Sequence, residues 1–85
     1  MKLLLSEQAW EDYQFWLATD KAVLKRVNQL IRDTARDPFQ GIGKPEPLRH
    51  ALKGYWSRRI TEEHRLVYRV DGDVLLLAQL RYHYE

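Results

Sequence analysis

The sequence predicts an α+β fold in which an N-terminal strand and two helices pack on a mainly antiparallel C-terminal sheet. Two stretches with apolar residues at helical spacing occupy the chain up to Arg36, and strand-like runs separated by turn signals occupy it from Tyr55 onwards. The 85 residues are enough for one modest core, so we expect a single domain spanning residues 1–85.

The composition is that of an ordinary globular protein with a basic bias. Hydrophobic residues make up 45% of the chain and charged residues 31%, and the formal net charge is +2. The cations concentrate in the C-terminal half, which favours an anionic partner. Cysteine is absent and no apolar run approaches the roughly 18 residues of a membrane span, so we expect a cytoplasmic protein without disulfides or membrane association. The histidines lack metal-binding spacing, and no cofactor is expected.

The N-terminal part predicts a strand followed by a helix. The apolar run Lys2–Leu5 is typical of a short strand, and Ser6 is a favourable N-cap for a helix from about Glu7 to Ala18. The helix face expected to pack on the sheet comprises Ala9, Trp10, Tyr13, Trp16 and Leu17.

A second helix is expected from about Asp20 to Arg36. It ends there because Asp37 precedes a proline, and residues in that position avoid helical angles. Its outer side is basic and carries Lys21, Lys25, Arg26, Arg32 and Arg36. Such a row is typical of a solvated helix face, and it also suits a surface for RNA or a partner protein.

Residues 39–48 are expected to form a loop that presents Glu46. This carboxylate lies between two prolines, which fix their own φ angles and restrict the preceding residues. Glu46 therefore stands on a stiff backbone, as suits a carboxylate that must be held in position. Lys44 and Arg49 flank it and would favour its ionised form if they lie close.

The sheet is predicted from the C-terminal third of the chain. Strands are expected at 55–60, 65–70 and from Val74 onwards, and the hydrophobic pattern favours a three-residue turn at 71–73 with Val70 opposite Val74. The apolar face of the last two strands would then comprise Leu66, Tyr68, Val70, Val74, Leu76, Ala78 and Leu80.

The other face of the predicted sheet is cationic. In the same register Arg65 lies opposite Gln79, with Arg81 and His83 further along this face. The turn at 61–64 leaves two pairings open, because an even loop places Arg58 beside Arg65 and an odd loop places Arg59 there. An arginine-rich face of this kind must meet anions or solvent, since unpaired arginine is almost never buried.

These residues suit the metal-independent cleavage of RNA. The RNA supplies its own 2′-hydroxyl nucleophile, and the protein must supply a general base, a general acid and fixed cations. Glu46 suits the base, His83 the acid, and Arg65 the cation, with Arg59 or Arg81 in support. Tyr82 and Tyr84 suit stacking on splayed bases. The same face also fits a plain RNA-binding module without catalysis.

Four segments in order resemble one family. Residues 43–48, 54–60, 61–68 and 81–84 read GKPEPL, GYWSRRI, TEEHRLVY and RYHY, and they resemble the YoeB toxins of the RelE/ParE superfamily. Trp10, Tyr13, Trp16 and Asp20 fit as well, so the resemblance spans nearly the whole chain.

The resemblance implies a RelE-like fold and a bacterial type II toxin that cleaves messenger RNA in the ribosomal A site without metal. In this family pattern Glu46 matches the general base, His83 the general acid and Arg65 the residue that stabilises the transition state. The resemblance also places Arg59 and Tyr84 in the active site, with Glu63 in support. Substrate contacts are expected from Arg59, Arg49, Lys44, Glu63, Arg81 and Tyr82.

The resemblance further implies a YefM-type antitoxin whose disordered acidic segment folds over the basic face, and it implies a homodimer. The sequence departs from the family at Arg49, where a lysine is common, and at Glu85, which follows the usual terminal tyrosine. An arginine fork and a lysine point charge are not interchangeable. Two other functions fit less of the pattern: a gyrase-inhibiting toxin of the same fold and a non-catalytic ribosome-binding module.

Overall fold

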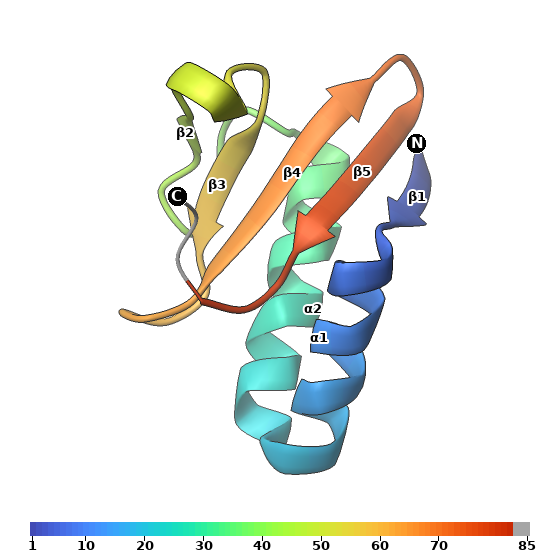
Figure 1. Ribbon diagram of the computed structural model, residues 1–85, viewed down its shortest axis with the longest axis vertical. Helices are drawn as coiled ribbons and strands as arrows, with labels where there is room; N and C mark the ends of the chain where they lie inside the picture. The colour runs from blue at the N-terminus through green and yellow to red at the C-terminus, as the bar shows by residue number, and fades with distance from the viewer. Residues whose placement is uncertain (83–85) are drawn as a thin grey trace.

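A computed structural model describes residues 1–82 (Figure 1). Within them, two helices, α1 (Glu7–Thr19) and α2 (Lys21–Arg36), pack side by side on one face of a five-stranded sheet. A short 3-10 helix, η1 (His50–Leu52), precedes the central strands. The strands lie in the order β1-β5-β4-β3-β2, and they are β1 (Lys2–Leu5), β2 (Glu46–Pro47), β3 (Trp56–Arg59), β4 (Arg65–Asp71) and β5 (Val74–Gln79). Because β1 is parallel to β5 and the other neighbours are antiparallel, the predicted α+β fold is confirmed.

Polar caps set the start of both helices. The Ser6 hydroxyl accepts a hydrogen bond from the N–H of Ala9 (3.0 Å) and donates one to the carbonyl of Ala78 (2.6 Å), which ties the start of α1 to the sheet. Asp20 accepts hydrogen bonds from two N–H groups in the first turn of α2. The helix ends agree with the predicted ones to within about one residue, the usual uncertainty of such boundaries.

The face of α1 that packs on the sheet differs from the predicted one. Trp16 and Asp12 are buried, whereas Trp10 and Leu17 are 56% and 48% exposed. Asp12 belongs to the buried stripe because its carboxylate accepts a hydrogen bond from the N–H of Leu80 (2.9 Å), a buried donor that needs a partner. The polar Asp12 therefore lies on the buried face of α1, where the apolar pattern predicted Trp10 and Leu17.

The β4–β5 hairpin has a shorter turn than predicted. Asp71 pairs with Val74, so the turn contains two residues, with Gly72 at a φ of +59° that favours glycine. This register places Val70 beside Leu75. The prediction of Val70 opposite Val74 is therefore wrong, and Leu75 and Leu77 are fully buried in place of Val74 and Leu76.

A β-bulge then restores part of the predicted face. Tyr68 pairs with Leu77 and Val67 with Gln79, so β5 contributes one extra residue, Ala78, at this point. The bulge reverses the alternation of β5 and returns Leu80 to the core, where it was expected. It also places Gln79 opposite Val67, so the predicted pairing of Gln79 with Arg65 is wrong.

The pairing of β3 with its neighbours places the polar residues. Arg59 pairs with Arg65, the odd-loop alternative, and Glu46 pairs with Ser57. Because residues two apart on a strand share a face, these four side chains lie on the open face of the sheet, away from the helices. The intervening residue, Arg58, points towards the helices instead.

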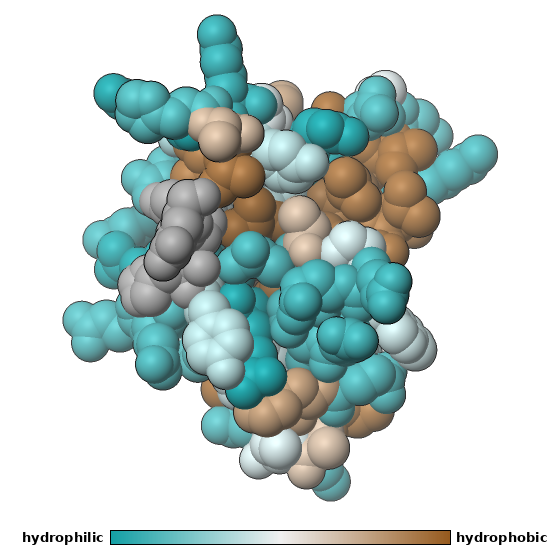
Figure 2. All heavy atoms as spheres, viewed as in Figure 1, coloured by the Kyte–Doolittle hydropathy of each residue, from teal (hydrophilic) through white to brown (hydrophobic). Residues whose placement is uncertain are grey.

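The open face is chemically divided. In Figure 2, apolar side chains gather over the β1 and β5 side of the sheet, and hydrophilic ones cover much of the rest. Leu4 of β1, which pairs with Leu76, is 55% exposed. Neither helix in residues 1–82 is long and apolar enough to cross a bilayer.

Candidate active site

Three strands bring the predicted base and two cations to one small hollow. Glu46 comes from β2, Arg59 from β3 and Arg65 from β4, and together with Lys44 they line a cavity of about 50 Å³ on the open face. The remaining lining residues are Gly43 and Ser57. We call this the cationic hollow. Its arginines lie directly opposite each other, so positive charge concentrates beside the carboxylate.

The backbone before Glu46 is tied to β3. The N–H of Arg59 donates a hydrogen bond to the carbonyl of Gly43 (2.7 Å), and Lys44 adopts a φ of +53°, which is uncommon for a residue with a side chain. Gly43 itself has a φ of +81° and approaches Leu30 so closely that an added Cβ would lie 2.7 Å from its Cδ2. These contacts thus fix the backbone just before Pro45, Glu46 and Pro47.

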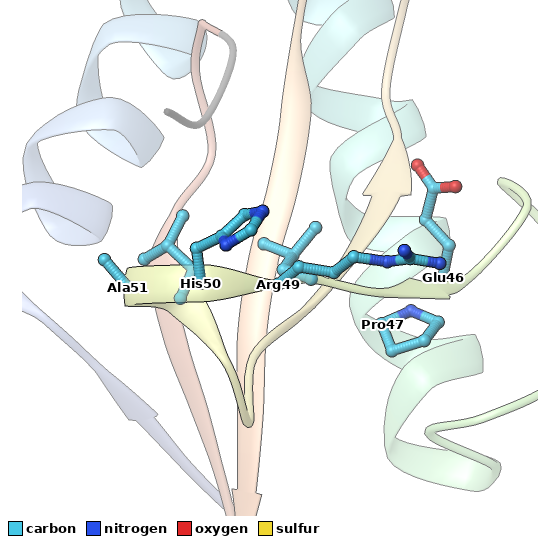
Figure 3. A pocket seen from close by; sticks show the side chains of 7 residues that line it. Glu46, Pro47, Arg49, His50 and Ala51 are labelled. Carbon is cyan, nitrogen blue, oxygen red and sulfur yellow. The ribbon is translucent and has the colours of Figure 1, made fainter.

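Glu46 also borders a larger hollow of about 520 Å³ (Figure 3). Residues 46–52 line it, and in Figure 3 Arg49 extends its guanidinium in the direction of Glu46. We call this the apolar hollow, because the lining is largely aliphatic beyond Arg49 and His50. It is larger but is built from one continuous segment, whereas the cationic hollow joins groups from three strands. Of the two, the cationic hollow is therefore the better candidate for acid–base chemistry, and the apolar hollow is its neighbour.

Arg65 is held by the turn that precedes it. The two N–H groups of its Nη1 are shared among the carbonyls of Thr61 (2.8 Å), Glu62 (3.1 Å) and His64 (3.2 Å). The Thr61 hydroxyl in turn accepts the N–H groups of Glu63 and His64. One end of the guanidinium thus caps the turn, which fixes the orientation of the side chain in the cationic hollow without neutralising it.

The other predicted substrate contacts lie outside the cationic hollow. The Glu63 side chain is 71% exposed and lies 3.3 Å from Nε2 of His64. Arg81 places its guanidinium over the rings of Phe15 (3.5 Å) and Tyr82 (4.6 Å), and Tyr82 is 54% exposed. Their position outside the cationic hollow does not test these predictions, because single-stranded RNA is long enough to contact residues beyond one hollow. His83, Tyr84 and Glu85 lie outside the described residues.

A buried arginine, which the sequence analysis grouped with the exposed cations, anchors the loop before Glu46. Arg58 is fully buried, and its five N–H groups are matched by five acceptors. They are a carboxylate oxygen of Asp33 (2.7 Å), the Tyr68 hydroxyl and the carbonyls of Asp37, Gln40 and Ile42. Arg58 thus does meet an anion, but the anion is Asp33 of the same chain, and Arg58 does not belong to the exposed cationic face with which it was grouped. Strand alternation indicates this position, because adjacent residues of a strand face opposite sides. If Arg59 faces outward, Arg58 faces the helices, where a buried arginine needs an acidic partner.

The Asp33 carboxylate stays ionised in this environment. Hydrogen bonds from Arg36, from the N–H of Ile42 and from Arg58 lower the pKa of Asp33 to about 2. Nearby, burial raises the pKa of the Tyr68 phenol, and the adjacent Arg58 opposes this change. The ion pair therefore persists at neutral pH and keeps the 37–43 loop closed over α2.

No group of three or more histidine, cysteine or carboxylate side chains within residues 1–82 is arranged to hold a metal ion. Sequence reasoning assigned no role to His64, and the structure shows that its ring contacts three separate segments of the chain. No periodicity or spacing in the sequence indicates that its ring meets the chain at Tyr82, 18 residues further on.

The fold and the three-strand site define a toxin of the RelE/ParE type. The family profile described as "YoeB-like toxin of bacterial type II toxin-antitoxin system" matches residues 5–84. Toxin YoeB of Escherichia coli K12 is 63% identical over 84 residues, covering 99% of this chain and 100% of that protein. The chain therefore belongs to the YoeB family and is a toxin of a type II toxin–antitoxin system.

Solved structures agree with this assignment. A YoeB/ParE toxin from Agrobacterium tumefaciens superposes with a TM-score of 0.96 at 52% identity, covering 99% of this chain and 100% of that one. YoeB of Staphylococcus aureus has been solved as a dimer, with a TM-score of 0.91 at 45% identity, and in a complex with YefM, with a TM-score of 0.90 at 44% identity. Both alignments cover 99% of this chain and 98% of the other.

Proposed function

We propose that this toxin is a ribosome-dependent endoribonuclease that cleaves messenger RNA in the A site without metal and so inhibits translation. The observation that carries the proposal is the convergence of Glu46, Arg59 and Arg65 from three strands on one hollow of the open face. A carboxylate beside two opposed guanidinium groups suits proton abstraction next to a phosphate. A plain binding surface needs the cations but has no use for the stiffened carboxylate.

In the proposed reaction, Glu46 takes the proton of the 2′-hydroxyl next to the scissile phosphate. The 2′-oxygen then forms a bond to phosphorus, and the bond from phosphorus to the 5′-oxygen breaks. Arg65 and Arg59 stabilise the charge that develops on the phosphorane oxygens. His83 gives a proton to the leaving 5′-oxygen, so the products are a 2′,3′-cyclic phosphate and a 5′-hydroxyl, and the cyclic phosphate can open to a 3′-phosphate.

The neighbouring groups are assigned to substrate binding. Lys44 and Arg49 lie on either side of Glu46 and would contact the flanking phosphates. The apolar hollow beside Glu46 has room for a nucleobase, and Tyr82 and Tyr84 would stack on bases nearby. Tyr84 also belongs to the proposed catalytic group. Glu63 lies in the β3–β4 turn and Arg81 in the C-terminal segment, so they would contact RNA outside the cationic hollow.

The partners proposed for this chain follow the S. aureus YoeB structures. A YefM-type antitoxin would neutralise the toxin, and its acidic segment would compete with RNA for the cationic hollow. A second copy of the chain would form a homodimer, as in the S. aureus YoeB dimer. The substrate is a message bound to the ribosome, since the sheet face is open and a strand must be presented to it in a fixed conformation.

Mapping of cleavage sites in a translating extract tests the proposal. Wild-type toxin should cut the message inside the occupied A site, and Glu46→Gln should lower the single-turnover rate by at least about 100-fold while ribosome binding is kept. Glu11→Gln, an exposed glutamate on α1, is the matched control and should cut normally. Intact message together with loss of DNA supercoiling would instead identify a gyrase inhibitor, and binding without any cut would identify a non-catalytic module.

A further inference from the structure

His64 lies at the end of the β3–β4 turn and takes no part in the chemistry proposed above. Its Nδ1 accepts a hydrogen bond from the backbone N–H of Tyr82 at 2.7 Å. The ring is 13% exposed and packs edge-on against Trp16 of α1, with centroids 4.9 Å apart. A largely buried imidazole that accepts a backbone N–H from a distant segment is well placed to hold that segment.

The contacts of the imidazole indicate which tautomer the ring adopts. Nδ1 must be unprotonated in order to accept the N–H of Tyr82, so the neutral ring carries its proton on Nε2. Nε2 lies 3.3 Å from a carboxylate oxygen of Glu63, which suits that tautomer. Trp16 from α1, Glu63 from the same turn and Tyr82 from the C-terminal segment thus fix the ring from three directions.

Tyr82 is held on both sides of its α-carbon. Its N–H donates to His64, and its carbonyl accepts a hydrogen bond from the N–H of Arg65 at 3.0 Å. Tyr82 has a φ of +64°, a left-handed conformation that is uncommon for a residue with a side chain and that needs such support. The carbonyl belongs to the peptide bond that joins Tyr82 to His83.

We propose that His64 is a positioning residue that holds the chain at Tyr82, and that proton donation by the next residue in sequence, the proposed general acid, depends on this hold. The proposal rests on the function proposed above and assigns His64 no contact with RNA. On this proposal two adjacent residues, the last of the turn and the first of β4, serve one reaction. Arg65 sends its side chain into the cationic hollow and its N–H to the Tyr82 carbonyl, while His64 fixes the preceding N–H.

Three substitutions separate the acceptor at Nδ1 from the rest of the ring. His64→Asn places an amide oxygen close to the position of Nδ1, His64→Gln places its amide near Nε2 instead, and His64→Leu has no acceptor. We expect His64→Gln and His64→Leu to lower the single-turnover cleavage rate on programmed ribosomes by about tenfold, the size of one lost hydrogen bond. The dissociation constant for the ribosome should stay within about twofold. His64→Asn should restore the rate to within about threefold of the wild type.

Hydrogen exchange of the Tyr82 amide gives a readout that does not depend on cleavage. The amide should be protected in the wild type and in His64→Asn, and its exchange should be about tenfold faster or more in His64→Gln and His64→Leu. Thermal unfolding shows which variants are folded. If His64→Leu does not fold, His64→Gln is the variant that is compared with the wild type. Unchanged exchange or an unchanged cleavage rate in the folded variants without the acceptor would overturn the inference. If the wild-type toxin cuts no message but its Tyr82 amide is protected, the proposed function is refuted, whereas the hydrogen bond between His64 and Tyr82 is supported.

Discussion

At the scale of single residues, the buried guanidinium of Arg58 decides how firmly the loop before Glu46 is held. A methionine in its place has similar length but removes the guanidinium donor from three loop carbonyls, and it leaves Oδ2 of Asp33 with the N–H of Ile42 alone. Breaking a buried ion pair from one side typically costs about 3–5 kcal/mol. We expect Arg58→Met to lower the free energy of unfolding by about 3 kcal/mol in urea denaturation.

Arg32→Met is the matched control for this change. Arg32 is an exposed arginine on α2, and exposed substitutions usually alter stability by less than about 0.5 kcal/mol. Equal effects of the two substitutions would mean that the loop contacts of Arg58 do not contribute to stability.

The carboxylate on the other side of this pair predicts an acid limit. The pKa of Asp33 falls from 3.8 to about 2 on folding, so the ionised form stabilises the fold above about pH 4. That stabilisation should disappear as the pH falls from about 4 to 2. The difference in melting temperature between the wild type and Asp33→Asn should therefore be constant from pH 7 to about 4 and shrink below it. A difference that already shrinks near pH 6 would point to another group.

At the scale of structural elements, the 37–43 loop depends on a glycine for close approach rather than for a turn alone. Gly41 has a φ of +130°, and an added Cβ would lie 2.0 Å from the Asp33 carboxylate. Gly54 has a φ of +97°, but nothing lies within 4 Å of its added Cβ. Both alanine variants carry backbone strain, and only Gly41→Ala also displaces the Asp33 side chain from Arg58.

We therefore expect Gly41→Ala to lose more stability than Gly54→Ala, by about 1–3 kcal/mol in denaturant titrations. Gly54→Ala should show only the cost of its φ angle, about 1 kcal/mol. Similar losses in both variants would show that the close contact with Asp33 relaxes at little cost.

The elements also show how far sequence reasoning reaches. Helix limits followed from Ser6, Asp20 and the proline at 38, because caps and breakers act locally. The β4–β5 register did not follow, because the turn uses two residues and the bulge at Ala78 interrupts an apparently regular alternation. The residue chemistry and the family resemblance both gave Glu46, Arg59 and Arg65 as site residues. Strand alternation indicates only that Arg58 and Arg59 face opposite ways, whereas the partners of Arg58 and His64 depend on tertiary pairing.

At the scale of the whole molecule, positive charge is distributed over two separate surfaces. One is the cationic hollow on the open face of the sheet, and the other is the outer side of α2, where Lys21, Lys25 and Arg32 line a shallow groove. The sequence left open whether the α2 surface binds RNA. This surface lies on the opposite side of the sheet from Glu46, so under the proposed function it does not contact the scissile phosphate.

A comparison of one arginine from each surface tests this separation. Arg59→Gln removes a donor from the cationic hollow and should lower the single-turnover rate on saturating ribosomes by about 100-fold. Arg32→Gln removes the same charge from α2 and should leave that rate unchanged. It is therefore the control for the change in net charge. A comparable loss of rate in both variants would mean that the rate follows overall charge and that the hollow has no special role.

The extra residue of β5 has a consequence for how this chain tolerates insertions and deletions. Two residues of β5 occupy the step between the partners of Tyr68 and Val67, where regular pairing needs one, so removing Ala78 would make the ladder regular and leave Leu80 facing the core. One further residue at this point would instead turn Leu80 outward and bring the chain to Tyr82 out of phase with His64. A deletion at the bulge should therefore be less damaging than an insertion there.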